Sequence, residues 1–231
     1  MSFCVRPMCP EDTPQVKEID RESFLSTWVQ TDFKNELKNP LAHYIVVGDE
    51  KIEVLTPEVK VTPTSVPGGL LSKVIGFLKH RAEPIPQARQ YIFGFAGFWT
   101  MADEAHITTL AVRGQHRRKG IGELLLISII DLARNLDARI LTLEVRISNT
   151  PAQSLYSKYG FKHVGLRHAY YTDNKEDGVK MSTEDINSAS FKQRLGKLKQ
   201  NYSKRYRIPV FNLKGVNPFS SPTGIHSARK T

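Results

Sequence analysis

The sequence "TTLAVRGQHRRKGIGELLLISIIDLA", residues 108–133, joins an apolar strand pattern, a basic turn and a long aliphatic helix. Five basic or imidazole side chains lie within the seven positions 113–119, and Gly120 and Gly122 come next. A helix that begins near Gly120 presents unpaired backbone N–H groups at the positive end of its dipole, which suits a phosphate group. Glycines let such a ligand approach the backbone without obstruction by a Cβ atom. The stretch therefore predicts an anion-binding turn, although an ordinary solvated basic turn would read the same way. The glycine spacing matches neither the GKS/GKT phosphate loop nor GxGxxG.

On both sides of this turn, strand patterns alternate with helix patterns. Apolar, β-branched and aromatic runs predict strands over residues 3–8, 42–48, 91–100, 104–112, 139–147, 162–171 and 177–183. Helical patterns, with acidic residues in the first turn of residues 10–24, predict helices over residues 10–24, 31–39, 120–136 and 150–160. This alternation predicts an α/β fold with a mixed central sheet flanked by helices.

Residues 49–90 interrupt the alternation with five prolines. Within them, residues 68–82 place apolar side chains at helical spacing with lysine and arginine elsewhere, which predicts an inserted arm with one amphipathic helix. We expect this helix to pack on its own domain; contact with a partner or a membrane surface is the alternative.

The net charge of +10 is confined to one end of the chain. No Asp or Glu follows Asp185, and the ten Lys and Arg residues after it account for the whole excess. We therefore expect one balanced domain over residues 1–185 and a flexible basic tail over residues 186–231. Aromatic residues interleaved with the tail cations suit RNA, and a solvated extension that only aids solubility is an equal alternative.

Bulk features predict a soluble, cytoplasmic protein with one substantial core. No apolar run approaches the ~18 residues that would span a bilayer, and the N-terminal residues have no signal-peptide pattern. Cys4 and Cys9 form neither a CxxC pair nor a Cys/His cluster, so we expect neither a disulfide nor a metal site.

Three segments resemble one family of enzymes. The segment "RRKGIG", residues 117–122, fits the (Gln/Arg)-x-x-Gly-x-(Gly/Ala) signature of the GNAT superfamily of acyl-CoA-dependent N-acetyltransferases. More narrowly, "TLEVRISNTPAQSLYSKYGF" (142–161) and "HAYYTDNKEDGVKM" (168–181) resemble the RimI group, which acetylates the N-terminal alanine of a ribosomal protein. The similarity covers about residues 3–183 apart from the inserted arm.

This resemblance implies acetyl-CoA as co-substrate and no metal. Leu110, Ala111 and Val112 would offer backbone hydrogen bonds to the pantetheine arm and the thioester. The pyrophosphate would bind main-chain amides of the turn, and Asn149 would be a further contact. The implied turn residues are Arg117, Arg118, Lys119, Gly120, Ile121, Gly122 and Glu123. Glu123 stands where relatives often carry a basic residue, which matters little if backbone groups are the ligands.

Acyl transfer to an amine needs a base for the amine proton and an acid for the departing thiolate. Glu144 lies in mid-strand on the face opposite Leu143 and Val145, where an ion pair with Arg146 or another cation would also account for it. Tyr156 lies in a short helix among apolar neighbours and could be a packing residue. The resemblance implies that Glu144 is the general base, acting through water, and that Tyr156 is the acid.

The substrate expectation rests on Tyr170 and Tyr171. They could form an ordinary hairpin edge, but the resemblance implies that they cover the first residues of a bound peptide. Gly178 replaces the alanine usual after Glu-Asp, which puts the hairpin geometry in question. We therefore expect acetylation of a protein N-terminal α-amine, in a ribosomal protein that begins with alanine. The alternatives are a broader N-terminal or lysine acetyltransferase, and a non-catalytic acyl-CoA-binding module whose tail docks on RNA; the presence of Glu144 and Tyr156 disfavours the module.

Overall fold

The protein is built around one seven-stranded mixed sheet. A computed structural model describes residues 3–24, 31–56 and 87–207. The strand order is β1-β2-β3-β4-β5-β7-β6, and all neighbours are antiparallel except β4 and β5, which run parallel. The strands are β1 Phe3–Pro7, β2 Ala42–Thr56, β3 Gln87–Met101, β4 Glu104–Val112, β5 Ile140–Arg146, β6 Lys162–Tyr171 and β7 Glu176–Ser182. The predicted α/β class with a mixed sheet is confirmed.

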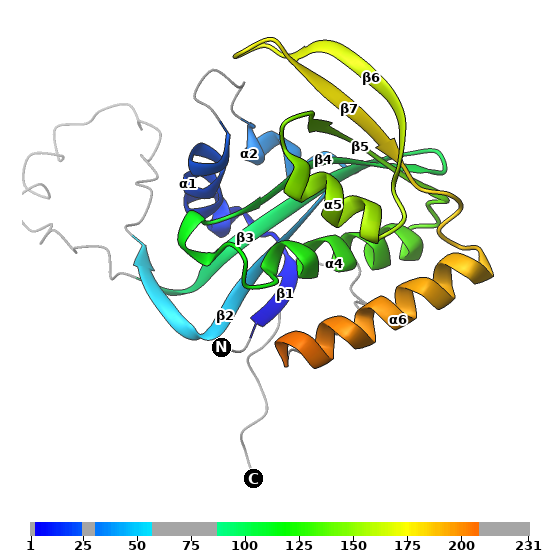
Figure 1. Cartoon of the computed structure of the whole chain (residues 1–231). Coiled ribbons are helices and arrows are strands. Elements are labelled where there is room, and N and C mark those ends of the chain that lie inside the picture. Colours follow the sequence, from blue (N-terminus) through cyan, green and yellow to red (C-terminus); the bar gives the residue numbers. More distant parts are fainter. Residues whose placement is uncertain (1–2, 25–30, 57–86, 208–231) are drawn as a thin grey trace, which may run out of the picture.

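Helices cover both faces of the sheet (Figure 1). The helices are α1 Thr13–Ser23, α2 Phe33–Glu36, α4 Ile121–Asn135, α5 Thr150–Lys158 and α6 Ala189–Tyr206, with 3-10 turns at Pro10–Asp12 and Gly114–His116. Successive residues of β2 point to opposite faces, as the pleat requires. Tyr44 and Val46 join the core under α1 and α2, whereas Ile45 and Val47 join the larger core under α4.

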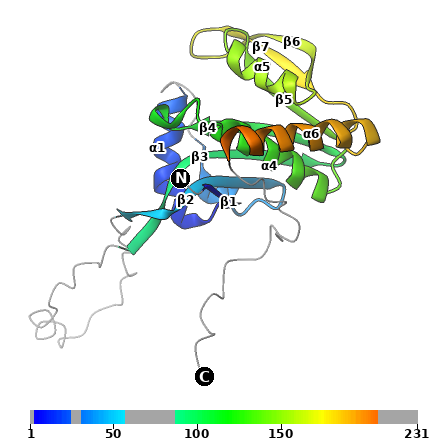
Figure 2. The same cartoon turned by 60° about the horizontal axis from the view of Figure 1, so that its bottom comes forward.

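The parallel strands β4 and β5 separate part-way along their length. Their pairing ends at Ile107 and Leu143, although β4 continues to Val112 and β5 to Arg146. On its other side, β4 pairs with β3 as far as Val112, with a shift of register that leaves Thr108 out of the ladder. Such a bulge bends the strand. The β5-facing edge of residues 108–112 therefore has no strand partner among the described residues. In Figure 2, β5, β7, β6 and α5 form one group, and β1–β4 with α4 and α6 form another.

The inserted arm is shorter than its composition indicated. Strand β2 continues to Thr56 and β3 begins at Gln87, so these strands occupy both ends of the expected 49–90 interruption. The ladder tolerates this because the β2–β3 pairing resumes from Glu53–Gln90 to Thr56–Gln87 after a shift of register. The amphipathic helix expected over residues 68–82 lies outside the described residues.

Residues 189–206, expected within a flexible tail, instead form the helix α6. Its Ser188 side chain caps the helix by accepting the Phe191 N–H at 3.2 Å. Phe191, Leu195 and Tyr202 are buried in the core that α4 shares. Lys199 Nζ contacts both carboxylate oxygens of Asp131 on α4 at 2.5 Å. Composition indicated disorder because most α6 residues are polar, but one apolar face is enough to pack the helix on the domain.

Candidate active site

The basic turn between β4 and α4 has the geometry of an anion cradle. Gly120 caps α4 with φ +85°, and Arg118 adopts φ +64°. The first helical hydrogen bond runs from Leu124 N–H to Gly120 O. The N–H groups of residues 120–123 therefore lie at the helix end, and among the described residues none has a backbone acceptor.

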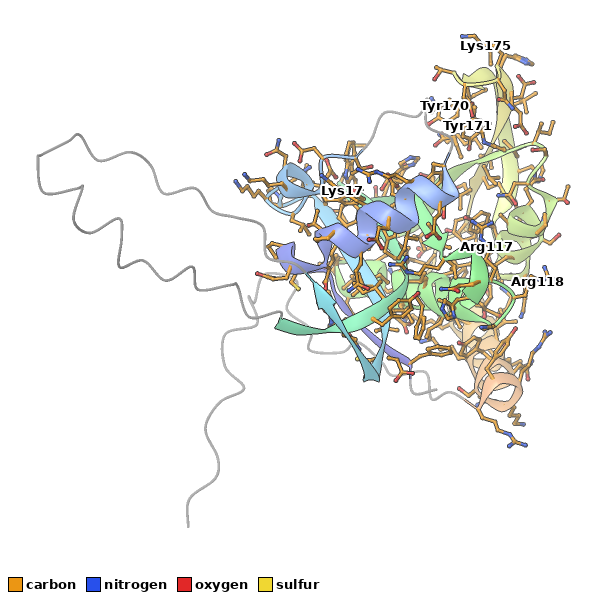
Figure 3. All side chains as sticks on the ribbon, turned by 90° about the vertical axis from the view of Figure 1, so that its left-hand side faces the viewer. Lys17, Arg117, Arg118, Tyr170, Tyr171 and Lys175 are labelled. Atoms are coloured by element: carbon orange, nitrogen blue, oxygen red, sulfur yellow. The ribbon has the colours of Figure 1, made fainter. Side chains whose placement is uncertain are left out.

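The cationic side chains of the turn differ in their contacts, and Lys119 Nζ lies 3.4 Å from His116 Nδ1. Arg117 donates to Val112 O at 3.1 Å and to Ser23 Oγ at 3.4 Å, which ties the turn to β4 and α1. Arg118 and Lys119 are exposed. Figure 3 shows Arg117 and Arg118 together on this side of the molecule. Glu123 is turned inward, where its carboxylate accepts from Lys158 Nζ at 2.5 Å and from Tyr159 Oη at 2.8 Å. Glu123, which stands where relatives often carry a basic residue, thus links α4 to Lys158 of α5 through its side chain. Its backbone N–H still lies at the cradle.

The cradle lies next to the unpaired edge of β4. A Cβ built on Gly122 would lie 3.7 Å from Leu110 Cδ2 and from Val112 Cγ2, which is ordinary van der Waals contact, so the protein itself leaves room for a methyl group there. A pantetheine arm could add to the unpaired edge of Leu110, Ala111 and Val112 as an extra strand would. Asn149 is partly engaged, because its side-chain oxygen accepts the Ala152 N–H and caps α5. Its amide nitrogen remains as a donor.

Glu144 lies beside the place where β4 and β5 separate. Its side chain is 4% exposed; Oε2 lies 3.2 Å from His106 Nε2, and Oε1 lies 3.0 Å from Arg167 Nε. The His106 hydrogen bond lowers the pKa of the Glu144 carboxyl, burial opposes this, and the charges of Arg167 and Lys180 add to the lowering. Glu144 is therefore ionised at neutral pH. The ion pair that was the alternative explanation for Glu144 forms with Arg167 and not with Arg146, which contacts Asp173 and Glu176 instead.

His106 is a site residue that the sequence did not reveal. Thr142 donates its hydroxyl proton to Glu104 Oε1 at 2.5 Å, so its oxygen accepts from His106 Nδ1 at 2.9 Å. Nε2 of His106 faces the Glu144 carboxylate at 3.2 Å, so the imidazole positions the carboxylate next to the place where β4 and β5 separate. The only signal in the sequence was a histidine in mid-strand, and its partner depends on the parallel register that sets His106 beside Thr142.

Tyr156 is buried in α5, with its ring 5.7 Å from that of Phe161. Burial raises the pKa of its phenol to about 12. The phenol therefore keeps its proton at neutral pH. This is the state in which it can donate a proton to a departing group.

The two adjacent tyrosines come from the β6–β7 hairpin. The Arg146 guanidinium lies 3.9 Å from the centre of the Tyr171 ring and also pairs with Asp173 and Glu176 in the hairpin. Burial raises the pKa of Tyr171, and the Arg146 guanidinium opposes this rise. Arg167 of β6 links the hairpin to Glu144: its Nε lies 3.0 Å from Glu144 Oε1, and its guanidinium lies 5.5 Å from the centre of the Tyr170 ring. In Figure 3, Tyr170 and Tyr171 lie together at the base of the hairpin that carries Lys175.

Gly178 explains how the hairpin accommodates Tyr170. A Cβ at Gly178 would lie 2.9 Å from Tyr170 Cδ1. An alanine there would push the ring away. The glycine that replaces the usual alanine at position 178 therefore makes room for the Tyr170 ring.

The chain is similar to known acetyltransferases. Residues 73–161 match the Acetyltransferase (GNAT) family. The chain is 35% identical over 178 residues to a Bacillus subtilis (strain 168) protein named, provisionally, as a ribosomal protein bS18-alanine N-acetyltransferase, covering 77% of this chain and 92% of that relative. The chain belongs to the GNAT acetyltransferase family. It is also 34% identical over 108 residues to an N-alpha-acetyltransferase of Sulfurisphaera tokodaii, covering 45% of this chain and 59% of that relative.

Solved structures show the same fold. The ribosomal-protein-S18-alanine N-acetyltransferase from Escherichia coli aligns with a TM-score of 0.57 at 21% identity, covering 79% of this chain and 94% of the other. The NatC complex bound to Gag peptide and CoA aligns with a TM-score of 0.56 at 18% identity, covering 80% of this chain and 99% of that one. As a GNAT acetyltransferase, the protein is a transferase that uses acetyl-CoA.

Within residues 3–24, 31–56 and 87–207, no helix is both long and apolar enough to span a bilayer. In the same ranges, no three His, Cys, Asp or Glu side chains gather as metal ligands would.

Proposed function

We propose that the protein transfers the acetyl group of acetyl-CoA to the N-terminal α-amine of a protein. The observation that carries the proposal is the meeting of Glu144 and the Tyr170–Tyr171 hairpin beside the separation of β4 and β5. The relatives named as N-acetyltransferases of protein N-termini support this substrate class. Acetyl-CoA supplies an activated acyl group as a thioester.

The residues of the chain bind and orient the donor. Backbone N–H groups of residues 120–123 hold the pyrophosphate, with Arg118 and Lys119 adding positive charge. The open edge of Leu110, Ala111 and Val112 binds the pantetheine arm, and Asn149 offers its amide nitrogen. These contacts set the acyl carbon near the end of the strand pairing at Ile107 and Leu143, close to Glu144.

Two side chains move protons. An α-amino group has an ordinary pKa of about 7.7–8.0, so at neutral pH it must lose a proton before it can attack. Glu144 receives that proton through water, and His106, 3.2 Å from its carboxylate, holds the carboxylate in position. Tyr156 donates its phenolic proton to the departing thiolate, because a thiol with an ordinary pKa of about 8.5 leaves as a protonated group at neutral pH.

The acceptor we favour is a ribosomal protein that begins with alanine, as the names of the relatives indicate. A broader range of N-termini, or lysine, remains the alternative for the same chemistry. A small side chain at the first position suits a site in which Tyr170 and Tyr171 lie over the peptide. A ribosomal acceptor would place the enzyme in the cytoplasm, as the sequence predicts.

The proposal is tested by intact-mass measurement with acetyl-CoA and peptides that differ only in their first residue. Selective modification of peptides with a small first residue supports the RimI-type assignment. Equal modification of all peptides favours the broad alternative. A wild-type enzyme that modifies no peptide would point to the non-catalytic module.

RNA contact remains a second proposal for the cations after residue 185. The structure assigns six of the ten to α6, where Lys199 and Arg194 pair with Asp131 and Glu184. If the remaining cations bind ribosomal RNA, co-sedimentation with ribosomes should weaken steeply with salt, by roughly 0.7 log units per log unit for each phosphate neutralised on a single strand. Salt-independent co-sedimentation, or none, would contradict this proposal.

A further inference from the structure

The C-terminal end of α6 reaches the phosphate cradle. A Cβ built on Gly120 would lie 2.8 Å from Cε1 and Cζ of Tyr206, so the Tyr206 ring covers that face of Gly120. Tyr206 also packs against Tyr202, with ring centres 4.9 Å apart. In Figure 3, this end of α6 lies just below the turn that carries Arg117 and Arg118. Two segments that are about ninety residues apart in the sequence therefore form one wall.

Two arginines flank Tyr206 and extend the positive charge of the cradle. The Arg205 guanidinium lies 5.3 Å from the centre of the Tyr206 ring, which holds it near the turn. Arg207 follows directly, with its backbone at φ +54°. Both are exposed, and neither forms an ion pair with any carboxylate in the described part of the chain. Earlier on α6, in contrast, Arg194 and Lys199 are paired with Glu184 and Asp131.

We propose that Arg205 and Arg207 bind the 3′-phosphate of coenzyme A, with the Tyr206 ring as the wall between this phosphate and the pyrophosphate turn. The inference rests on the proposed coenzyme site at residues 117–123. It gives α6 a part in substrate binding in addition to its packing.

Coenzyme A carries a second phosphate that the turn would not bind. In addition to the pyrophosphate it has a separate phosphate on the ribose, and the N–H groups of the turn serve only the pyrophosphate in the proposed site. Lys158 of α5 is already engaged with Glu123. Arginine suits a phosphate because its planar fork donates two parallel hydrogen bonds. The competing explanation is that these cations only complement the negative end of the α6 dipole.

Calorimetry with coenzyme A and with 3′-dephospho-coenzyme A separates the two explanations. In the double variant R205Q/R207Q, the dissociation constant for coenzyme A should rise about tenfold, whereas that for the dephospho form should not change. The matched control K192Q/K197Q removes the same charge from exposed positions in the N-terminal half of α6 and should retain the wild-type preference for coenzyme A.

Other outcomes overturn the inference. If R205Q/R207Q weakens both ligands equally, or neither, the arginines do not bind the 3′-phosphate. If the wild-type protein binds coenzyme A and its dephospho form equally well, the arginines likewise do not bind the 3′-phosphate. If the wild-type protein binds neither ligand, the proposed coenzyme site fails as well, and this result is distinct from the others.

Discussion

At Glu144, an almost fully buried carboxylate is held between an imidazole and a guanidinium. Its pKa lies below the ordinary value, so the carboxylate stays charged as pH falls through the range in which a free glutamate would be protonated. The residue is therefore ready to accept a proton across the neutral range. Glu144 and Tyr156 could be chosen as candidate site residues from the sequence, because both lie in one continuous segment that resembles a family. His106 could not be chosen in this way, because its contact with Glu144 depends on the pairing of two strands, β4 and β5, that are distant in sequence.

Replacing Glu144 with Gln keeps the shape of the side chain but removes the base. Because general-base catalysis contributes about 10²–10⁴-fold, kcat should fall by that factor with little change in coenzyme affinity. Steady-state kinetics together with calorimetry would measure both quantities. Wild-type turnover in E144Q would show that Glu144 is only an ion-pair residue.

At Gly122, a methyl group meets only ordinary van der Waals contacts within the protein. Gly122→Ala should therefore fold normally and yet bind coenzyme A about tenfold more weakly, because the methyl occupies the approach of the pyrophosphate. The control is Gly165→Ala on β6, away from the turn, where an added Cβ meets nothing within 4 Å. Equal affinity in the two variants would place the pyrophosphate elsewhere.

Among the elements, the β6–β7 hairpin depends on Arg146 of β5, which contacts Tyr171, Asp173 and Glu176 together. The hairpin strands were predictable from their alternating pattern and turn residues. Arg146, which joins the hairpin to β5, was considered only as one possible ion-pair partner of Glu144. Side-chain partners across a sheet follow from register and exposure, which local patterns do not specify.

Replacing Arg146 with Ala should loosen the hairpin over the peptide. We expect kcat/KM for the peptide to fall by between about tenfold and a hundredfold, because the substrate is less well positioned, whereas coenzyme affinity stays unchanged. Arg139→Ala is the matched control: Arg139 also faces two carboxylates, Asp103 and Asp185, outside the hairpin. If both variants behave alike, Arg146 has no special role in substrate binding.

Over the whole molecule, α6 belongs to the same core as α4 and the sheet. The order of strands and helices up to residue 183 followed from hydrophobic periodicity. The helix at 189–206 was missed because the ten Lys and Arg residues after Asp185 suggested disorder. Beside that charge, an apolar face of three buried side chains is a weak signal. The separation of β4 and β5 was equally hidden, since it arises from a bulge and not from composition.

Leu195→Ala tests whether α6 is part of the domain. Removing a buried leucine typically costs about 2–5 kcal/mol, so the free energy of unfolding measured with denaturant should fall by that amount. Leu41→Ala, at an exposed leucine, should change it by less than about 0.5 kcal/mol. Similar values for both variants would mean that α6 adds nothing to the stability of the domain.

The central claim is that the site beside Glu144 acetylates an α-amine. The most direct measurement is fragment-ion mass spectrometry of one alanine-initiated peptide with a single internal lysine, after incubation with acetyl-CoA and the wild-type enzyme. We predict one added acetyl group, located on the N-terminal nitrogen, and no product from the same peptide with a blocked N-terminus. Acetylation of the lysine, or of the blocked peptide, would contradict this account.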